Sequence, residues 1–288
     1  MSDLNRRPTH RYPEVGRCIY CGATGPELSD EHVIPFALGG HLLLSKASCK
    51  SCANETHAFE GKTAGTTLRN IRLRYGFPTR RKKQRETHVE IGTIDERGRP
   101  GRAKVPVTEY PVGAMFPHFG RSGFVLGTPP NLDVLRHTAN VYSTDDLNEF
   151  AARYKWNKEA TLAHFPVEFA RTIGKISYAY AVAELGYGSF TPICIPHIMS
   201  KNHNVSYVFG QVGMNTPIKG EQPVWKIELL FATYHGKPML YAFCSLLPEM
   251  GTPIYEVLLG YFESDAQISF FKEQLANKSI VIAPLSFT

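Results

Sequence analysis

Two pairs of cysteines constrain this chain more than any other feature of its sequence. Cys18 and Cys21 form one Cys-x-x-Cys pair, Cys49 and Cys52 form a second, and 27 residues lie between the pairs. Four thiolates complete the tetrahedral coordination of a zinc ion, and such an ion has no open position for a substrate. The spacing therefore predicts a structural Zn²⁺ site rather than a catalytic one.

The start of the chain is consistent with a reducing compartment. The first ten residues contain no apolar run of the kind that a secretory signal needs, and no segment approaches the roughly 20 apolar residues of a membrane span. We therefore expect a cytoplasmic protein without a membrane span, whose paired cysteines bind metal. Cys194 and Cys244 stand in apolar surroundings, so we expect them to be small buried hydrophobic residues.

The positive charge of the chain is concentrated in its first third. Residues 1–104 contain 19 Lys and Arg against 11 Asp and Glu, a net charge of +8, whereas the rest of the chain carries −2. Such asymmetry suggests a polyanionic partner for the part that holds the cysteine pairs.

The segment between the cysteine pairs carries the residues that bear chemistry. It reads DEHVIPFALGG from Asp30 to Gly40. This segment resembles the HNH endonucleases of the ββα-metal superfamily, in which an Asp/Glu-His pair, an apolar residue, a proline and often Gly-Gly precede a Cys-x-x-Cys that opens a helix. The resemblance covers about residues 16–62. It implies a zinc-stabilised ββα-metal (HNH) module that hydrolyses phosphodiester bonds in nucleic acid.

The resemblance also implies roles for individual residues. His32 would be the general base, because an imidazole can accept the proton of a water molecule at neutral pH. Glu31 would hold Mg²⁺ or Mn²⁺, which neutralises charge on the phosphate. Neighbouring side chains on a regular strand point to opposite faces, so Glu31 and His32 share a site only if the strand ends or bulges there. Asp30 is the alternative ligand.

Two positions depart from the family pattern. The position of the middle HNH residue falls at Leu44, which can still orient the imidazole through its backbone carbonyl. The residue after the last cysteine, often Asn or His in the family, is Ala53, which cannot bind metal. We expect Asn54 to be the second metal ligand, with His57, one helical turn beyond Ala53, assisting or replacing it. Glu60 is expected to be solvated or to face phosphate.

A basic segment follows the module. It contains no acidic residue, and we expect its side chains to contact phosphates, mostly without regard to sequence. The candidate nucleic-acid-binding residues are Lys62, Arg69, Arg72, Arg74, Arg80, Arg81, Lys82, Lys83 and Arg85.

Helical and strand patterns mix along the chain, which predicts an α+β fold with a small N-terminal module and a larger α+β domain. We expect an HNH-type domain over residues 1–78, a basic, turn-rich linker or hairpin over 79–104, and a domain for specificity, sensing or assembly over 105–288. The expected elements are strands at 28–34, 42–47, 89–95, 103–109, 224–234, 239–247, 255–262 and 280–283, and helices at 50–61, 63–75, 166–185 and 265–277.

Three functional hypotheses follow. The first is a metal-dependent endonuclease that cuts double-stranded DNA. The second is a catalytically inactive, zinc-stabilised nucleic-acid-binding module, which Ala53 favours. The third is a nuclease effector gated by a C-terminal sensor domain, through which the chain could also form a homo-oligomer or bind a regulatory partner.

Overall fold

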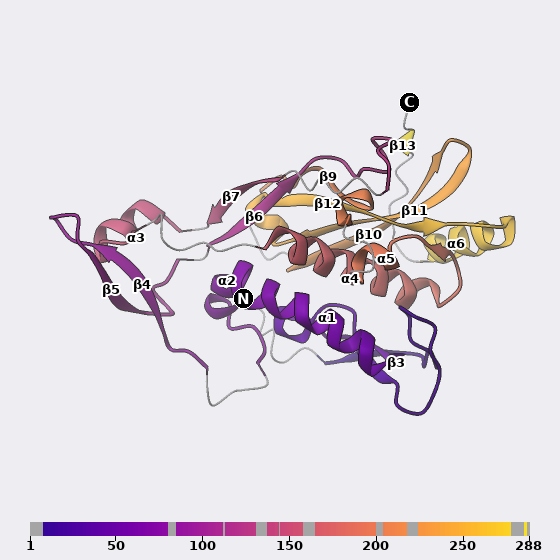
Figure 1. The fold of residues 1–288 in the computed structure, drawn as a ribbon, viewed down its shortest axis with the longest axis horizontal. Helices are drawn as coiled ribbons and strands as arrows, with labels where there is room; N and C mark the ends of the chain where they lie inside the picture. The colour runs from indigo at the N-terminus through magenta and orange to yellow at the C-terminus, as the bar shows by residue number, and fades with distance from the viewer. Residues whose placement is uncertain are drawn as a thin grey trace.

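The computed structural model describes residues 8–79, 85–111, 113–130, 137–143, 145–157, 165–199, 204–217, 224–277 and 285–286. It contains both helices and sheets in substantial amounts, so the predicted α+β class is confirmed. Its elements form an N-terminal module, a projecting hairpin lobe and a large C-terminal sheet, with one long helix at the centre (Figure 1).

The N-terminal module is a small sheet followed by a helix, as the sequence predicts. Its strands lie in the order β1-β3-β2, and β2 and β3 are antiparallel. Helix α1 begins directly after Cys49, its N-cap residue. The elements are β1 (His10–Tyr12), β2 (Ser29–His32), a 3-10 turn η1 (Phe36–Leu38), β3 (Leu42–Ser48) and α1 (Lys50–Lys62).

Both glycines of the Gly-Gly turn between β2 and β3 are required by the backbone. Gly39 has a φ of 85°, in the left-handed region that glycine adopts without strain. A Cβ atom at Gly40 would lie 1.7 Å from the carbonyl oxygen of Ile34. The turn therefore folds tightly back onto the segment after His32 and fixes the end of β2.

The helix expected at 63–75 is interrupted. A π-helical turn, η2 (Thr63–Thr67), follows α1 without a break, and a shorter helix α2 (Arg69–Arg74) comes after it. Extra residues in a turn of this kind rotate the following helix about its axis. Helix α2 nevertheless buries Ile71, and Gly76 ends the segment with a φ of 63°.

A lobe with a core of its own projects from the molecule. It is built from the hairpin β4 (His88–Ile94) and β5 (Pro100–Pro106) and from α3 (Leu147–Tyr154). Strand β5 begins three residues before its expected start, because Asp95 accepts hydrogen bonds from the backbone of Arg97 and Arg99 and closes a short turn. The buried residues of the lobe are Val89, Ile91, Val105, Tyr110 and Phe150.

The C-terminal sheet has the strand order β13-β10-β11-β12-β8, and β9 also pairs with β12. The strands expected at 224–234, 239–247 and 255–262 and the helix at 265–277 are confirmed, whereas 280–283 lies outside the described residues. The elements are β8 (Thr191–Pro192), β9 (Phe209–Met214), β10 (Trp225–Tyr234), β11 (Lys237–Leu246), β12 (Pro253–Tyr261), α6 (Asp265–Asn277) and β13 (Leu285–Ser286).

Several short elements have no counterpart among the sequence predictions. Strands β6 and β7 form a separate antiparallel pair, and the other elements join the larger ones. They are β6 (Gly113–Phe119), β7 (His137–Ser143), α5 (Ile195–Ile198), η5 (Val205–Tyr207) and η6 (Pro248–Met250).

Helix α4 (Pro166–Leu185) connects the N-terminal module to the C-terminal sheet. It begins at the predicted proline and ends before Gly186. It lies between α1 on one side and β11 and β12 on the other (Figure 1). Most of its residues are buried, on all sides of the helix, because both neighbours cover it. One hydrophobic core therefore runs through the module and the sheet, and the division at 79–104 stays a prediction.

Candidate active site

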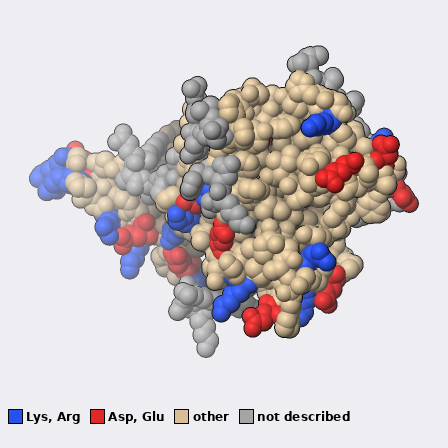
Figure 2. Space-filling view, turned by 45° about the vertical axis from the view of Figure 1, so that its right-hand side comes forward, with Lys and Arg blue, Asp and Glu red and all other residues tan. Residues whose placement is uncertain are grey.

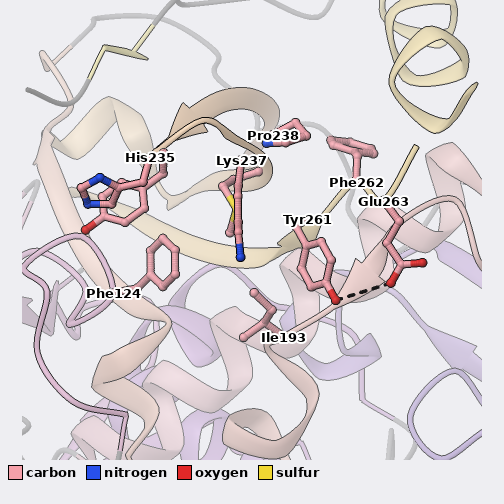
Figure 3. Close-up of a pocket in the computed structure, with 10 residues that line it drawn as sticks. Phe124, Ile193, His235, Lys237, Pro238, Tyr261, Phe262 and Glu263 are labelled. Carbon is pink, nitrogen blue, oxygen red and sulfur yellow. Dashed lines mark hydrogen bonds between the residues drawn. The ribbon is translucent and has the colours of Figure 1, made fainter. Parts of the chain in front are cut away.

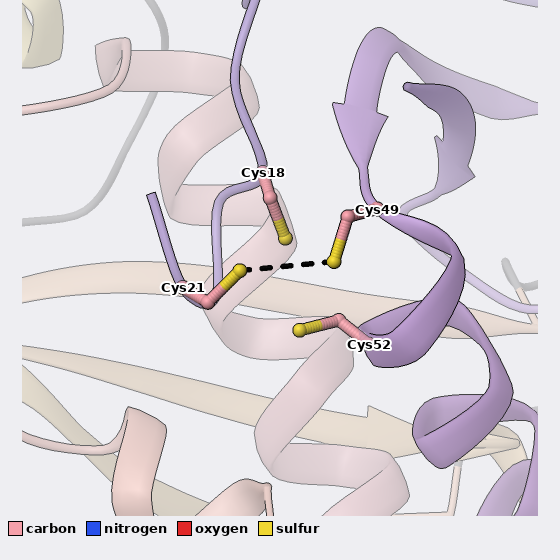
Figure 4. Close-up of side chains that lie close together, drawn as sticks. All are labelled: Cys18, Cys21, Cys49 and Cys52. Carbon is pink, nitrogen blue, oxygen red and sulfur yellow. Dashed lines mark hydrogen bonds between the residues drawn. The ribbon is translucent and has the colours of Figure 1, made fainter. Parts of the chain in front are cut away.

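The four paired cysteines come together as the sequence predicts. Their Sγ atoms all lie within 4.8 Å of one another, and Cys21 Sγ and Cys49 Sγ are 3.7 Å apart (Figure 4). Zinc–sulfur bonds of about 2.3 Å in a tetrahedron place neighbouring sulfurs about 3.8 Å apart. The cluster therefore fits a zinc ion, with one pair from the turn before β2 and the other from the start of α1. Cys194 and Cys244 are buried elsewhere, as expected.

The thiols of this cluster differ in how readily they ionise. Burial raises the pKa of Cys18 and of Cys52. The pKa of Cys49 falls to about 7, chiefly because the backbone N–H of Cys52 at the start of α1 donates a hydrogen bond to it. The Cys49 thiol, at the first turn of the helix, therefore ionises readily to the thiolate, which is the form that binds a metal ion.

The β-strand that carries the Glu-His pair ends at His32 and is irregular just before it. The register of β2 against β3 shifts between Ser29 and Glu31, and Glu31 and His32 then pair with Leu44 and Leu43. The bulge thus lies at Asp30, one residue earlier than the sequence argument required. As a result, the Glu31 side chain points into the protein and is 7% exposed.

Glu31 meets a cation from the C-terminal part of the chain. Lys175, on α4, is fully buried, and its Nζ lies 2.6 Å from Glu31 Oε1 and 2.8 Å from Glu60 Oε1. The same ammonium donates a hydrogen bond to the backbone carbonyl of His32. One lysine therefore links both members of the Glu-His pair to the end of α1.

The electrostatics of this cluster favour a charged lysine. Burial lowers the pKa of Lys175, but the carboxylates of Glu31 and Glu60 more than compensate, so the pKa ends above its ordinary value. Burial raises the pKa of Glu60, and Lys175 counteracts part of that rise. The expectation that Glu60 is solvated is therefore wrong: its side chain is 15% exposed and is paired with Lys175.

Sequence reasoning does not find Lys175, because nothing local connects it with the Glu-His pair. The only signal is the lysine itself, which stands alone in the apolar stretch TIGKISYAYAVA of α4. A charged residue in such a stretch is buried only when it is paired. The partner of Lys175 becomes clear only once α4 lies against α1.

Asp30, the alternative metal ligand, lies on the outer side of β2. Its carboxylate accepts hydrogen bonds from the Arg11 guanidinium and from the backbone N–H of Lys46. The hydrogen bond from Arg11 holds the pKa of Asp30 below its ordinary value, and His32 adds a smaller effect of the same sign. Asp30 therefore lies near His32 as a charged, hydrogen-bonded carboxylate.

His32 itself is half-buried at the end of β2. Its ring lies beside that of Phe36, with 5.8 Å between the ring centroids. The peptide group that follows His32 is held at both of its polar atoms, because Lys175 donates to the His32 carbonyl and the Val33 N–H donates to the carbonyl of Leu42 at 3.0 Å. The side chain is thus presented from a rigid turn, which suits a catalytic base.

The other candidate ligands lie on α1. Asn54 and His57 are exposed, whereas the same helix buries Cys52, Thr56 and Phe59. Leu44, at the position of the middle HNH residue, is 2% exposed and pairs with Glu31 across β2 and β3. The metal-binding roles of Asn54 and His57, and the orienting role of Leu44, stay predictions.

The basic segment divides into side chains with internal partners and others near the surface. Arg72 donates to the carbonyls of Ala37 and Ala64 at 2.7 and 2.9 Å, and burial lowers its pKa. Arg74 and Arg85 also donate to backbone carbonyls. Residues 80–83 lie outside the described residues. Phosphate contact by these residues stays a prediction.

Two of the basic residues form exposed ion pairs. Lys62 Nζ lies 2.7 Å from Glu168 Oε1, and Arg69 pairs with Glu86. Figure 2 shows basic and acidic side chains next to each other along the edge of the visible face and on the projecting end formed by β4 and β5. Exposed pairs of this kind contribute little to stability.

A separate cavity of about 650 Å³ lies against the C-terminal sheet. In Figure 3 the Lys237 side chain is seen between the rings of Phe124 and Tyr261, and the Tyr261 hydroxyl contacts Glu263 at 3.4 Å. The other lining residues shown include Ile193, His235, Pro238 and Phe262. None of the candidate residues of the nuclease module lines this cavity.

Comparison with known proteins identifies the N-terminal module. Residues 18–64 match the HNH endonuclease family, a span that begins at Cys18 and includes all of α1. Neither the comparison with curated proteins nor that with solved structures gives a match. No helix among the described residues is long and apolar enough to cross a membrane. The family match coincides with the cysteine cluster and the Glu-His pair, so residues 18–64 of this chain are an HNH endonuclease domain.

Proposed function

We propose that this protein is a metal-dependent endonuclease that hydrolyses phosphodiester bonds in DNA. The observation that carries the proposal is the position of His32: it stands in the family-matched segment between the two clustered cysteine pairs, at the end of a strand that pairs with β3. A water molecule near its imidazole would lose a proton to it and attack the phosphorus.

A divalent ion, Mg²⁺ or Mn²⁺, would be held by Glu31 together with Asn54 or His57. When bound, such an ion neutralises charge on the phosphate and on the leaving oxygen. The residues present fit this ion only in part, because Glu31 Oε1 already contacts Lys175 while Asn54 and His57 lie on the exposed side of α1. Asp30 is a second carboxylate close to His32, and it accepts hydrogen bonds from Arg11 and from the backbone N–H of Lys46.

Double-stranded DNA is the proposed substrate, and the basic residues after α1 would hold its backbone. Lys62 and Arg69 are suited to this role because their side chains are exposed and form ion pairs with Glu168 and Glu86 at the protein surface. Their contacts would be independent of sequence and sensitive to salt. A cytoplasmic location is proposed because the six cysteines form no disulfide with one another. The cavity against the C-terminal sheet would suit an effector that gates the nuclease.

A plasmid-nicking assay with Mg²⁺ or Mn²⁺ tests the proposal. The protein should convert supercoiled DNA to nicked or linear forms, and His32→Ala should abolish cutting while its zinc content stays unchanged. His41→Ala, which replaces another histidine of the same turn region, is the matched control and should cut normally. A His32→Ala protein that cuts as well as the parent would refute the mechanism.

The alternative is a nucleic-acid-binding module that does not cut. Two observations favour it: Ala53 stands where the family often has a metal ligand, and Lys175 already neutralises Glu31. Salt-sensitive DNA binding without cleavage under any divalent metal would establish this second function in place of the first.

A further inference from the structure

The ammonium of Lys175 contacts the HNH domain at the Glu-His pair itself. Its Nζ lies 2.6 Å from Glu31 Oε1 and 2.8 Å from Glu60 Oε1, and it donates a hydrogen bond to the backbone carbonyl of His32. These contacts join the last two residues of β2 to the end of α1. We call Lys175 and these three partners the Lys175 clamp.

Lys175 can influence the reaction only from inside the protein. Its side chain is 0% exposed, so neither DNA nor an attacking water molecule touches it. A role as a phosphate contact or as a proton donor to the substrate is therefore excluded. Any effect of Lys175 on cutting must pass through the groups that it holds.

The group that matters most is the peptide that follows His32. Lys175 donates to the carbonyl of this peptide, and the Val33 N–H donates to the carbonyl of Leu42 at 3.0 Å. The Cα atom of His32 lies in the plane of the same peptide group. A fixed peptide plane therefore fixes this Cα atom and restricts the direction in which the imidazole points.

Helix α4 gives the Lys175 clamp a rigid base, because residues 172–179 are all buried. Two neighbours of Lys175 also contact the HNH domain, at places other than the Glu-His pair. Thr172 Oγ1 lies 2.9 Å from Thr63 Oγ1, and the Tyr178 hydroxyl donates to the carbonyl of Ile19 at 2.7 Å. These two contacts provide matched controls for the clamp.

We propose that Lys175 is a positioning residue for the His32 base, through which α4 makes the geometry of the active site depend on the C-terminal part of the chain. The inference rests on the proposed function in taking His32 as the base. It holds whichever carboxylate binds the divalent ion. A displacement of about 1 Å in a reacting group lowers the rate by about a hundredfold, so a small shift of the turn is enough to be measured.

The test is steady-state cutting of supercoiled plasmid by full-length, zinc-loaded variants, each checked for folding by zinc content and circular dichroism. Lys175→Met removes the ammonium and keeps a side chain of similar length. We expect its kcat to fall by about tenfold to a hundredfold. Its KM for DNA should stay within about twofold of the parent value, because the buried lysine does not touch DNA. Lys175→Arg keeps the charge and the donors, and it should recover part of the lost kcat.

Two control variants remove other contacts between α4 and the HNH domain. Tyr178→Phe removes the hydrogen bond to Ile19, and Thr172→Val removes the contact with Thr63. Both should keep the kcat of the parent, even where they lower the Tm. An equal loss of kcat in Tyr178→Phe would overturn the specific role of Lys175, and so would an unchanged kcat in Lys175→Met.

Hydrogen exchange at the Val33 amide tests the clamp without the reaction. This amide should exchange faster in Lys175→Met than in the parent and at the parent rate in Tyr178→Phe; an unchanged rate in Lys175→Met would overturn the proposal. A parent protein that does not cut refutes the nuclease, whereas this exchange rate still decides whether Lys175 holds the His32 turn.

A second variant guards against misfolding. Lys175→Met leaves two buried carboxylates without a cation, whereas Lys175→Met combined with Glu60→Gln leaves only one. The double variant also lacks the donor to the His32 carbonyl, so it should show the same loss of kcat and the same faster exchange. If neither variant folds, Lys175 is required for folding rather than for positioning, and the proposal is overturned.

Discussion

The indole Nε1 of Trp225 donates a hydrogen bond to the carbonyl oxygen of Leu38 at a distance of 2.9 Å. This bond joins the first residue of β10 to the turn that follows the Glu-His pair. Together with Lys175, which contacts the other end of the same segment, it means that the C-terminal part of the chain braces the HNH domain from two directions. The turn that follows the Glu-His pair is therefore not stabilised by the small zinc module alone.

Trp225→Phe should destabilise the protein by about 0.5–1.5 kcal/mol, the ordinary net contribution of one hydrogen bond. The measurement is urea-induced unfolding followed by circular dichroism. Trp156→Phe is the control, because the buried Nε1 of Trp156 has no partner among the described residues and its removal breaks no hydrogen bond. Equal losses in the two variants would show that the Trp225 bond contributes nothing.

The local part of this architecture can be predicted from the sequence. Cysteine spacing, the Gly39-Gly40 turn, and the start and end of α4 each depend on residues close together in the chain, and each is where the sequence predicts it. Because side chains alternate in direction along a strand, the sequence also indicates that Glu31 and His32 face opposite sides of β2. The Glu31 side chain indeed points inward.

The long-range part cannot be predicted in this way. The partners of Glu31 and Glu60 come from a helix far along the chain, and no periodicity in α1 or α4 indicates that Lys175 will reach them. Helical periodicity also misleads for α4 itself. An amphipathic helix has one apolar face, whereas two separate layers bury this helix from both sides.

Zinc removal should loosen the turn before β2 and the start of α1, while the C-terminal sheet keeps its strands. The cysteine cluster links the turn before β2 to the start of α1, so the protein should contain one zinc per chain and lose it in Cys52→Ser. Elemental analysis and hydrogen exchange of residues 18–64 measure both effects. Cys244→Ala, at a buried cysteine in β11, should keep its zinc; an unchanged zinc content in Cys52→Ser would contradict the assignment.

Arg72 and Lys62 should separate stability from DNA binding. Arg72→Gln removes a guanidinium that donates to two backbone carbonyls, so it should lower the unfolding free energy by about 2–3 kcal/mol.

Lys62→Gln should lower the unfolding free energy by less than about 1 kcal/mol, because the ion pair of Lys62 is exposed. The same variant should nevertheless bind DNA more weakly. The slope of the logarithm of its DNA affinity against the logarithm of the salt concentration should be smaller by about one. Fluorescence anisotropy at several salt concentrations measures that slope. An unchanged slope would exclude Lys62 from the DNA interface.

The stability of the C-terminal part should fall with acidification below about pH 6.5, the ordinary range for histidine. Burial lowers the pKa of His197, and the hydrogen bond that its Nδ1 donates to the Asn204 carbonyl at 2.6 Å only partly offsets this. Between the lowered folded pKa and the unfolded value, the unfolded chain binds a proton that the folded chain does not. Stability is therefore complete above the unfolded pKa and is lost as the pH falls.

The corresponding measurement is the unfolding free energy between pH 5 and 7. One such histidine contributes a slope of at most about 1.4 kcal/mol per pH unit. His197→Asn keeps a donor for the Asn204 carbonyl and removes the titrating ring, which stacks on Tyr207 with centroids 5.4 Å apart. The stability of the variant should depend less on pH, although burial of His118 leaves a slope of the same sign. A His197→Asn variant whose stability depends on pH as strongly as that of the parent would contradict this role of His197.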